Sequence, residues 1–196
     1  MLKLTKDFYI TAINKRFGYK SSYLEKECLY TFVYKEYQIE LNIEFKIIGY
    51  TKEDNIAMIN FGYVVDIEKW SNKHQRYCYI NDLDKENGKS TKKYLDSKDA
   101  REILLRFVER FIKNYLEKVS PAIIIRGALS EIKLNLPRYK RFDKLFCKNY
   151  TKKELDIDKY NSLYKICGNY KEDENKTIWV YAKKESHLLQ LKEVIK

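Results

Sequence analysis

Residues 96–121 have the sequence DSKDAREILLRFVERFIKNYLEKVSP, which contains the most regular apolar pattern in the chain. Its apolar side chains recur every three or four residues, which places them on one face of an α-helix. The other face is charged, with Glu102 four residues before Arg106, the order that stabilises a solvated helix surface. Asp96 or Ser97 can cap the helix start. A helix with this stripe must lie on a large apolar surface. The apolar positions are Ala100, Ile103, Leu104, Phe107, Val108, Phe111, Ile112, Tyr115, Leu116 and Val119.

Three segments before this helix predict antiparallel strands. Residues 37–47 alternate apolar and polar side chains, and residues 59–67 repeat the alternation, so each strand has one buried face and one wet face. Residues 28–34 are rich in β-forming side chains, and Lys35-Glu36 is short enough for a tight hairpin. The three strands form an antiparallel β-meander, and the long amphipathic helix is its natural cover.

Further strands and helices follow at the C-terminus. Residues 122–127 (AIIIRG) predict a short strand, and a helix begins near Pro137. Residues 177–182 predict another strand, and residues 186–196 predict a terminal helix. The fold class is therefore α+β. The segments that fit either a helix or a strand are residues 1–27 and 155–166.

Length and composition predict one soluble domain over residues 1–196. No apolar run approaches the roughly 20 residues of a membrane span, and the N-terminus lacks the apolar core of a signal peptide. We therefore expect a cytoplasmic protein with no membrane contact and with reduced cysteines. Residues 70–95 are polar and predict an exposed loop, either functional or mobile, in which residues 77–80 fit a short strand.

The net charge of +11 indicates an acidic partner, of which nucleic acid is the first candidate. Only eight of the 39 basic residues are Arg, the residue that nucleic-acid readers favour for bidentate contacts. Lys, Tyr, Asn and Ile are all over-used, as A/T-rich coding produces regardless of function. The charge is thus either functional or a coding bias.

A basic cluster with an aromatic residue among its members is the first candidate site. Such a cluster suits phosphate contacts and base stacking, or the acidic surface of a protein partner. In the alternative interpretation Tyr139 is a core residue, Arg126 pairs with an acid such as Glu131, and the other cations form a solvated helix face. The cluster consists of Arg126, Arg138, Tyr139, Lys140 and Arg141.

The lysines of the predicted loop are a second candidate for phosphate contacts. Lys89, Lys92 and Lys93 follow two tyrosines, Tyr77 and Tyr79. Carboxylates between the tyrosines and these lysines dilute the positive field, so a simple solvated loop is the alternative.

The wet face of the predicted meander supplies the catalytic alternative. Glu40, Glu44 and Lys46 share this face, and Asp66 falls near Glu40 if the two strands pair. Glu44-Phe45-Lys46 matches the Glu-x-Lys half of a metal-dependent nuclease site, in which carboxylates hold Mg²⁺ and the lysine assists the attacking water. The preceding strand, however, lacks the acidic partner, and the other interpretation is a solvated sheet face. His74 and Cys78 have no further ligands at metal-site spacing, so we expect no metal and no cofactor.

The strand at Ala122–Gly127, followed by a helix that contains Arg138-Tyr139, resembles short uncharacterised α+β proteins of phages and other mobile elements. The resemblance implies an α+β fold and a mobile-element origin, and it carries no known activity. The resulting hypothesis is a non-enzymatic binding protein that docks the Arg/Tyr cluster and the 70–95 loop onto nucleic acid or a nucleoprotein. Inhibition of a host defence complex is one use of such binding. The alternative is a metal-dependent nuclease.

Overall fold

The computed structural model describes residues 8–16, 24–80, 94–95, 97–129, 136–155 and 176–194. These residues belong to two compact units. The first unit draws on Met1–Phe17, Lys26–Glu44 and Tyr63–Phe111, and the second on Gly18–Glu25, Phe45–Gly62 and Ile112–Lys196. The sequence-based expectation of a single domain stays a prediction.

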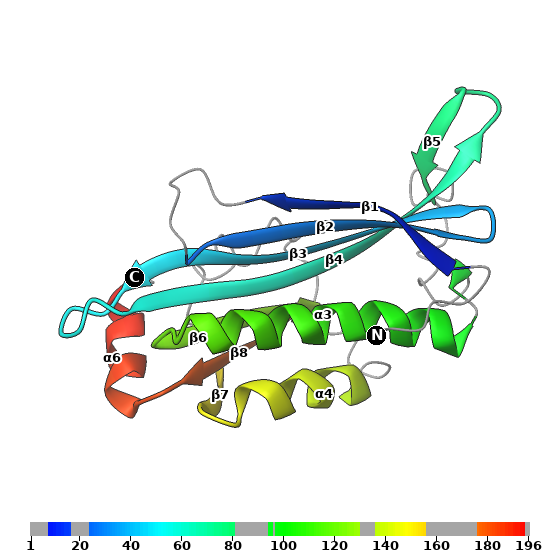
Figure 1. Cartoon of the computed structure of the whole chain (residues 1–196). Coiled ribbons are helices and arrows are strands. Elements are labelled where there is room, and N and C mark those ends of the chain that lie inside the picture. The colour runs from blue at the N-terminus through cyan, green and yellow to red at the C-terminus, as the bar shows by residue number, and fades with distance from the viewer. Residues whose placement is uncertain are drawn as a thin grey trace. The chain divides into compact units, whose positions relative to one another are not determined.

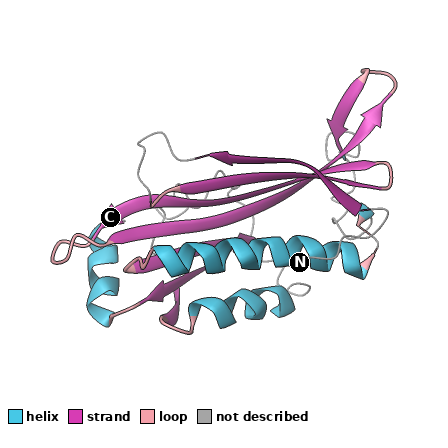
Figure 2. Cartoon of the chain, in the orientation of Figure 1, coloured by secondary structure: helices cyan, strands magenta, loops and turns pink. Residues whose placement is uncertain are grey.

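The described residues form eight strands and three helices, labelled in Figure 1 and coloured by type in Figure 2. The strands are β1 (Phe8–Arg16), β2 (Lys26–Tyr34), β3 (Tyr37–Tyr50), β4 (Ala57–Ser71), β5 (Arg76–Tyr79), β6 (Ile123–Leu129), β7 (Thr151–Leu155) and β8 (Lys176–Ala182). The helices are α3 (Lys98–Lys118), α4 (Leu136–Phe146) and α6 (Glu185–Val194). The strand order is β1-β2-β3-β4-β6-β8-β7, with β5 beside β4. The β4–β6 pair is parallel and the sheet is mostly antiparallel, so the predicted α+β class is confirmed.

Helix α3 forms where the apolar periodicity predicts it. The Ser97 hydroxyl oxygen accepts hydrogen bonds from the backbone N–H groups of Asp99 (3.2 Å) and Ala100 (3.4 Å), so Ser97 caps the helix. The apolar positions that are buried in the structure are Ala100, Ile103, Leu104, Phe107, Val108, Ile112, Tyr115 and Val119.

Aromatic rings of β2 and α3 form the core of the first unit. The Phe107 ring meets the rings of Tyr30 and Phe32 edge-on, with centroids 4.8 Å and 5.2 Å away. The Phe8 ring of β1 lies 5.1 Å from that of Phe32. Edge-to-face contacts of this kind add to the free energy gained from burying the rings, so within this unit α3 is held against β2.

Strand β1 settles the N-terminal segment that the sequence leaves open. It pairs antiparallel with β2, and the register shifts at a β-bulge between Ile10 and Ala12. The bulge explains the ambiguity, because Ile10 and Ile13 are spaced three apart and break the alternation expected of a strand.

Residues 70–79, predicted as part of an exposed loop, form the end of a β-hairpin. Strand β4 continues to Ser71 and pairs with β5, so that Trp70 lies opposite Tyr77. Gln75 closes the turn with a left-handed φ of 51°. The hairpin projects from the first unit in Figure 1. The sequence indicates its second strand at residues 77–80 but not the continuation of β4 to Ser71, because residues 68–76 are mostly polar and lack apolar alternation. Residues 81–93 of the predicted loop lie outside the described part of the chain.

The sheet of the second unit is covered on both faces. On one face Met58, Ile123 and Ile125 join a cluster with Leu191 of α6. On the other face, Phe61 packs edge-on against Phe146 of α4, with ring centroids 5.7 Å apart. The predicted alternation therefore differs from the structure at the start of β4, where five consecutive residues are buried. These residues are Ala57, Met58, Ile59, Asn60 and Phe61.

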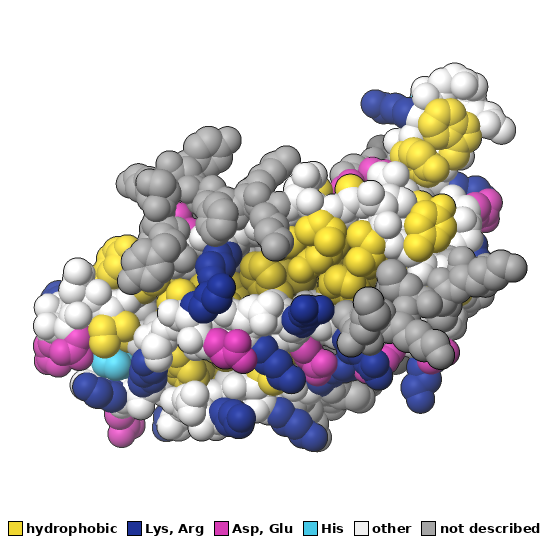
Figure 3. Space-filling model, viewed as in Figure 1, with side chains coloured by type: hydrophobic (Ala, Val, Ile, Leu, Met, Phe, Trp, Pro, Cys, Tyr) yellow, Lys and Arg dark blue, Asp and Glu magenta, His cyan; other side chains and the backbone are white. Residues whose placement is uncertain are grey.

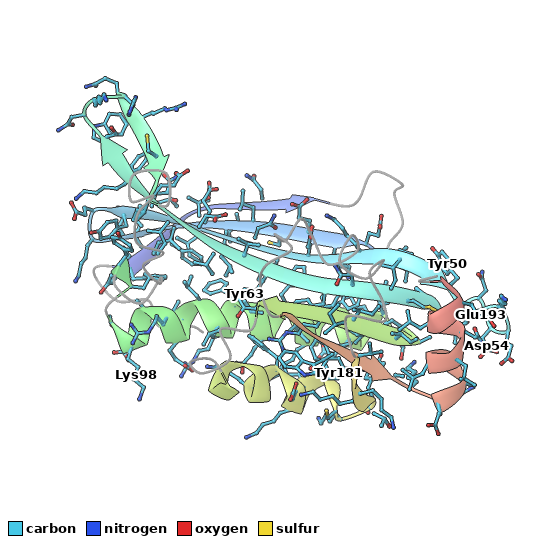
Figure 4. The ribbon with its side chains drawn as sticks, turned by 180° about the vertical axis from the view of Figure 1, so that it is seen from behind. Tyr50, Asp54, Tyr63, Lys98, Tyr181 and Glu193 are labelled. Carbon is cyan, nitrogen blue, oxygen red and sulfur yellow. The ribbon has the colours of Figure 1, made fainter. Side chains whose placement is uncertain are left out.

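Helix α6 is tied to the β3–β4 turn of the same unit. The backbone N–H of Lys52 donates to Gln190 Oε1 (3.0 Å), and Lys52 Nζ lies 2.5 Å from a Glu193 carboxylate oxygen. Figure 4 shows Glu193 beside Asp54 of that turn. None of the described helices has both the length and the apolar character needed to cross a membrane.

Candidate nucleic-acid interface

The predicted Arg/Tyr cluster is divided between strand β6 and helix α4. Arg126 belongs to β6, whereas Arg138, Tyr139, Lys140 and Arg141 belong to α4. Arg141 is half-buried. The side chains of the three residues before it lie outside the described part of the structure. The predicted loop lysines Lys89, Lys92 and Lys93 also lie outside the described residues.

Arg126 lies beneath α4 and not on its outer surface. Only 3% of the residue is exposed. Its guanidinium carbon is 4.9 Å from the ring centroid of Phe142 and 5.7 Å from that of Trp179. Cation–π contacts of this type stabilise a buried cation. We therefore assign Arg126 to the interior and exclude it from any contact surface.

A polar cluster next to Arg126 joins α4 to strands β7 and β8. The Tyr181 hydroxyl donates to one carboxylate oxygen of Asp143 (2.5 Å), and Lys152 Nζ donates to the other (2.5 Å). Lys152 also lies over the Trp179 ring, 4.8 Å from its centroid. Burial and the hydrogen bond to Asp143 raise the pKa of Tyr181 well above that of a free tyrosine. Figure 4 labels Tyr181 in this layer. The negative charge of Asp143 is thus balanced from within the fold.

Because Tyr181 and Lys152 balance the negative charge of Asp143, the outer surface of α4 is strongly basic. Residues 136–148 carry five Lys or Arg and one acid, Asp143 itself. Lys144 and Lys148 are exposed. Figure 3 shows Lys and Arg side chains along α4 at the lower edge of the view. Basic side chains on one helix, without exposed acids, attract the phosphate backbone of a nucleic acid. We call Arg141 and Lys144 of α4, together with Lys148 in the turn after it, the α4 basic surface. Arg138 and Lys140, whose side chains lie outside the described structure, stay predicted members.

The carboxylates of the alternative nuclease site lie on the first unit's sheet. Burial raises the pKa of Asp66. Burial, together with the carboxylates of Glu40 and Asp66, raises the pKa of Glu68, although the hydrogen bond from Gln38 (3.0 Å) opposes this shift. Of the other predicted residues, Glu44 is half-buried in the same unit and Lys46 belongs to the second unit. Among the described residues, three or more His, Cys, Asp or Glu side chains nowhere come together in a group that could hold a metal ion.

Sequence reasoning missed both Lys144 and Lys148 and the partners of Asp143. A charge count over residues 136–148 is enough to find the two lysines, because the local excess of cations needs no structure. The Asp143–Tyr181 contact spans 38 residues and has no local signal.

Comparisons of the chain with protein-family models, with curated proteins and with solved structures find no match.

Proposed function

We propose that the protein binds nucleic acid through the α4 basic surface and catalyses no reaction on it. The observation that carries the proposal is the local charge: five cations stand in the thirteen residues 136–148, and the single acid there is engaged by Lys152 and Tyr181. Lys144 and Lys148 are exposed, and within residues 136–148 Asp143 is the one carboxylate. Contacts of this kind are independent of base sequence and are weakened by salt.

The experiment measures anisotropy of a labelled oligonucleotide over a series of salt concentrations. The test variant is Lys144→Glu/Lys148→Glu, and the control is Lys98→Glu/Lys118→Glu, which changes the net charge equally at the two ends of α3. Each lysine that contacts a phosphate contributes about 0.7 to 0.9 to the slope of log K against log salt. We expect the test variant to lose affinity and about 1.5 of this slope, and the control to keep its slope. Equal losses in both variants would show that only net charge matters and overturn the proposal.

The same oligonucleotides, incubated with Mg²⁺, test whether the function is non-enzymatic. We expect them to stay intact. Cleavage that disappears in Glu44→Gln would overturn the proposal in favour of the metal-dependent nuclease, because Glu44 is the carboxylate of the predicted Glu-x-Lys pair.

The proposal includes a setting. The resemblance to phage and mobile-element proteins favours a cytoplasmic nucleoprotein of the host, such as a defence complex, as the place where the binding acts. We also propose, as the sequence predicts, that α3 covers the whole β2–β4 meander. In that arrangement the outer faces of the helices stay available to partners.

A further inference from the structure

The outer part of the β4–β5 hairpin in the first unit, residues 69–79, carries positive charge and no acid. Residues 69–79 include Lys69, Lys73 and Arg76, and neither Asp nor Glu occurs among them. Lys69 forms an ion pair with Glu36 (3.2 Å), so its charge is balanced. Lys73 and Arg76 are exposed. The outer part of the hairpin therefore favours an anionic ligand.

Two large aromatic rings stand exposed on the same hairpin. Trp70 and Tyr77 are cross-strand partners whose ring centroids lie 5.4 Å apart at an interplanar angle of 77°. The residues are 46% and 42% exposed, whereas Trp179 in the second unit is 8% exposed. Figure 3 shows apolar and basic side chains beside each other on this hairpin. An edge-to-face pair stabilises a hairpin, but it leaves much of both rings available to a ligand.

Local hydrogen bonds hold the Trp70 ring and the turn in one arrangement. The indole N–H of Trp70 donates to Asn72 Oδ1 (3.1 Å), and the side-chain amide of Gln75 donates to the backbone carbonyl of Asn72 (2.7 Å). A ring fixed in this way loses little freedom when a flat ligand stacks on it. The fixed ring and the exposed cations of the hairpin therefore suit a ligand in which a flat, apolar group is attached to an anion.

The neighbouring carboxylate of Glu68 determines the side from which such a ligand can approach the hairpin. Glu68 is two residues before Trp70 on β4, and so shares its face of the ribbon. Its charge repels phosphates from the sheet side. Arg76 lies on the opposite face, because its pair with Ser71 is adjacent to the Trp70–Tyr77 pair. A phosphate chain that passes from the ring face over the tip meets Lys73 in the turn, then reaches Arg76 on the other face, and avoids Glu68.

We propose that the β4–β5 hairpin binds single-stranded nucleic acid, with unpaired bases stacked on Trp70 and Tyr77 and phosphates contacted by Lys73 and Arg76. The nucleic-acid class of the ligand rests on the proposed function, and the single-strand preference rests on the exposed rings. Bases in a duplex are already stacked on each other and cannot stack on these rings, whereas each base of a single strand has a free π-face. This surface belongs to the first unit and the α4 basic surface to the second.

The test compares an oligo(dT) strand with a duplex of the same length. The stacking variant is Trp70→Leu/Tyr77→Leu, and its matched control is Trp70→Phe/Tyr77→Phe, which keeps two aromatic faces. A stacked base contributes enough affinity that we expect a loss of about 5- to 150-fold per ring for oligo(dT) with the leucines. We expect the phenylalanine control to stay within a few-fold of wild type and duplex binding to stay unchanged in both variants.

Tryptophan emission gives a second readout that does not depend on the leucine variant folding. Oligo(dT) should quench the emission of the wild-type protein, and Trp70→Phe should remove this quenching, because Trp179 is buried. Lys73→Glu/Arg76→Glu leaves both rings in place and should weaken oligo(dT) binding at least tenfold.

The outcomes separate this inference from the proposed function. If strand and duplex bind equally well and the leucine, phenylalanine and wild-type proteins do not differ, the hairpin inference fails while the α4 basic surface stands. If the Lys73→Glu/Arg76→Glu variant loses the quenching of tryptophan emission but keeps its affinity for oligo(dT), the hairpin inference is also overturned. If neither oligonucleotide binds the wild-type protein, both proposals fail.

Discussion

Replacing Asp143 by Asn should destabilise the fold and strengthen nucleic-acid binding at the same time. The substitution keeps the shape of the side chain and removes its charge. In the native protein the two carboxylate oxygens accept hydrogen bonds from Tyr181 and Lys152, each at 2.5 Å. The Asp143 and Lys152 side chains are 18% and 30% exposed, so water screens the ion pair only in part.

The magnitude follows from these contacts. A hydrogen bond to a charged group contributes about 1.5 to 3 kcal/mol when its partner is removed. An isolated buried pair costs about 3 to 5 kcal/mol when one member is lost. Because Lys152 can turn towards solvent, we expect Asp143→Asn to lower the free energy of unfolding by about 2 to 4 kcal/mol. Tyr181→Phe breaks one hydrogen bond to this charged group and leaves the ion pair, so about 1.5 to 3 kcal/mol is expected.

Urea denaturation, followed by circular dichroism and by tryptophan emission, measures both losses. The unfolding midpoint should fall while the slope stays unchanged, since the surface exposed on unfolding is the same. Trp179 lies over Lys152 and reports on the cluster directly. A loss for Asp143→Asn within about 0.5 kcal/mol, the usual range of surface substitutions, would refute the assignment of a structural role to this cluster.

Asp143→Asn should raise the affinity for nucleic acid although it lowers the stability of the fold. Removing Asp143 deletes the one acid of the α4 segment and releases Lys152 from its ion pair. At temperatures where the variant is folded, its affinity for an oligonucleotide should rise about two- to fivefold, the effect of about one unit charge near the surface in water. Weaker binding by the folded variant would contradict a phosphate-contacting surface on α4.

Three further predictions concern the rest of the chain. Phe107→Ala removes a ring that meets Tyr30 and Phe32, and should lower the free energy of unfolding by about 3 to 5 kcal/mol in urea melts. Gly62→Ala adds a methyl group that meets no heavy atom within 4 Å, so it should stabilise the protein by about 0.4 to 1 kcal/mol in the same melts. Burial raises the pKa of Tyr150 to about 12, so the folded state holds this proton more tightly than the unfolded chain, whose tyrosines titrate near 10. The stability from this group is complete below pH about 10 and is lost as the pH rises towards 12, and Tyr150→Phe should flatten that part of an alkaline stability profile.

The elements that the sequence predicts well are those with a strict period and a single buried face. Helix α3 has a 3.6-residue stripe and a Ser97 cap, and β3 alternates between buried and less buried positions from Ile39 to Phe45. The elements that the sequence leaves open or misses break these conditions for physical reasons. Strand β1 contains a bulge, and β7 (TKKEL) is rich in charge because it ends the described strand order, where lysines discourage pairing with other chains.

The candidate site was predictable in its location and not in its members. The sequence directs attention to α4, and α4 carries the local excess of charge. The cluster predicted from the sequence also includes Arg126. An arginine is expected at the surface, because this residue type is almost never fully buried unless it is paired. Burial of this residue depends on Phe142 and Trp179, which are 16 and 53 positions away in the sequence. No local pattern contains that information.

The distribution of charge bears on whether the excess of lysine is functional. Coding bias adds lysines wherever the fold tolerates them, so it predicts similar densities on all exposed surfaces. In this chain cations occupy about one position in five overall, but five of thirteen positions in residues 136–148. The first unit's sheet shows the reverse, with Glu40, Asp66 and Glu68 close enough to raise the pKa of Glu68. Within the second unit the positive charge gathers on α4, and within the first unit negative charge gathers on part of the sheet. Coding bias alone predicts neither concentration, which is why we favour a specific binding surface over a uniformly basic coat.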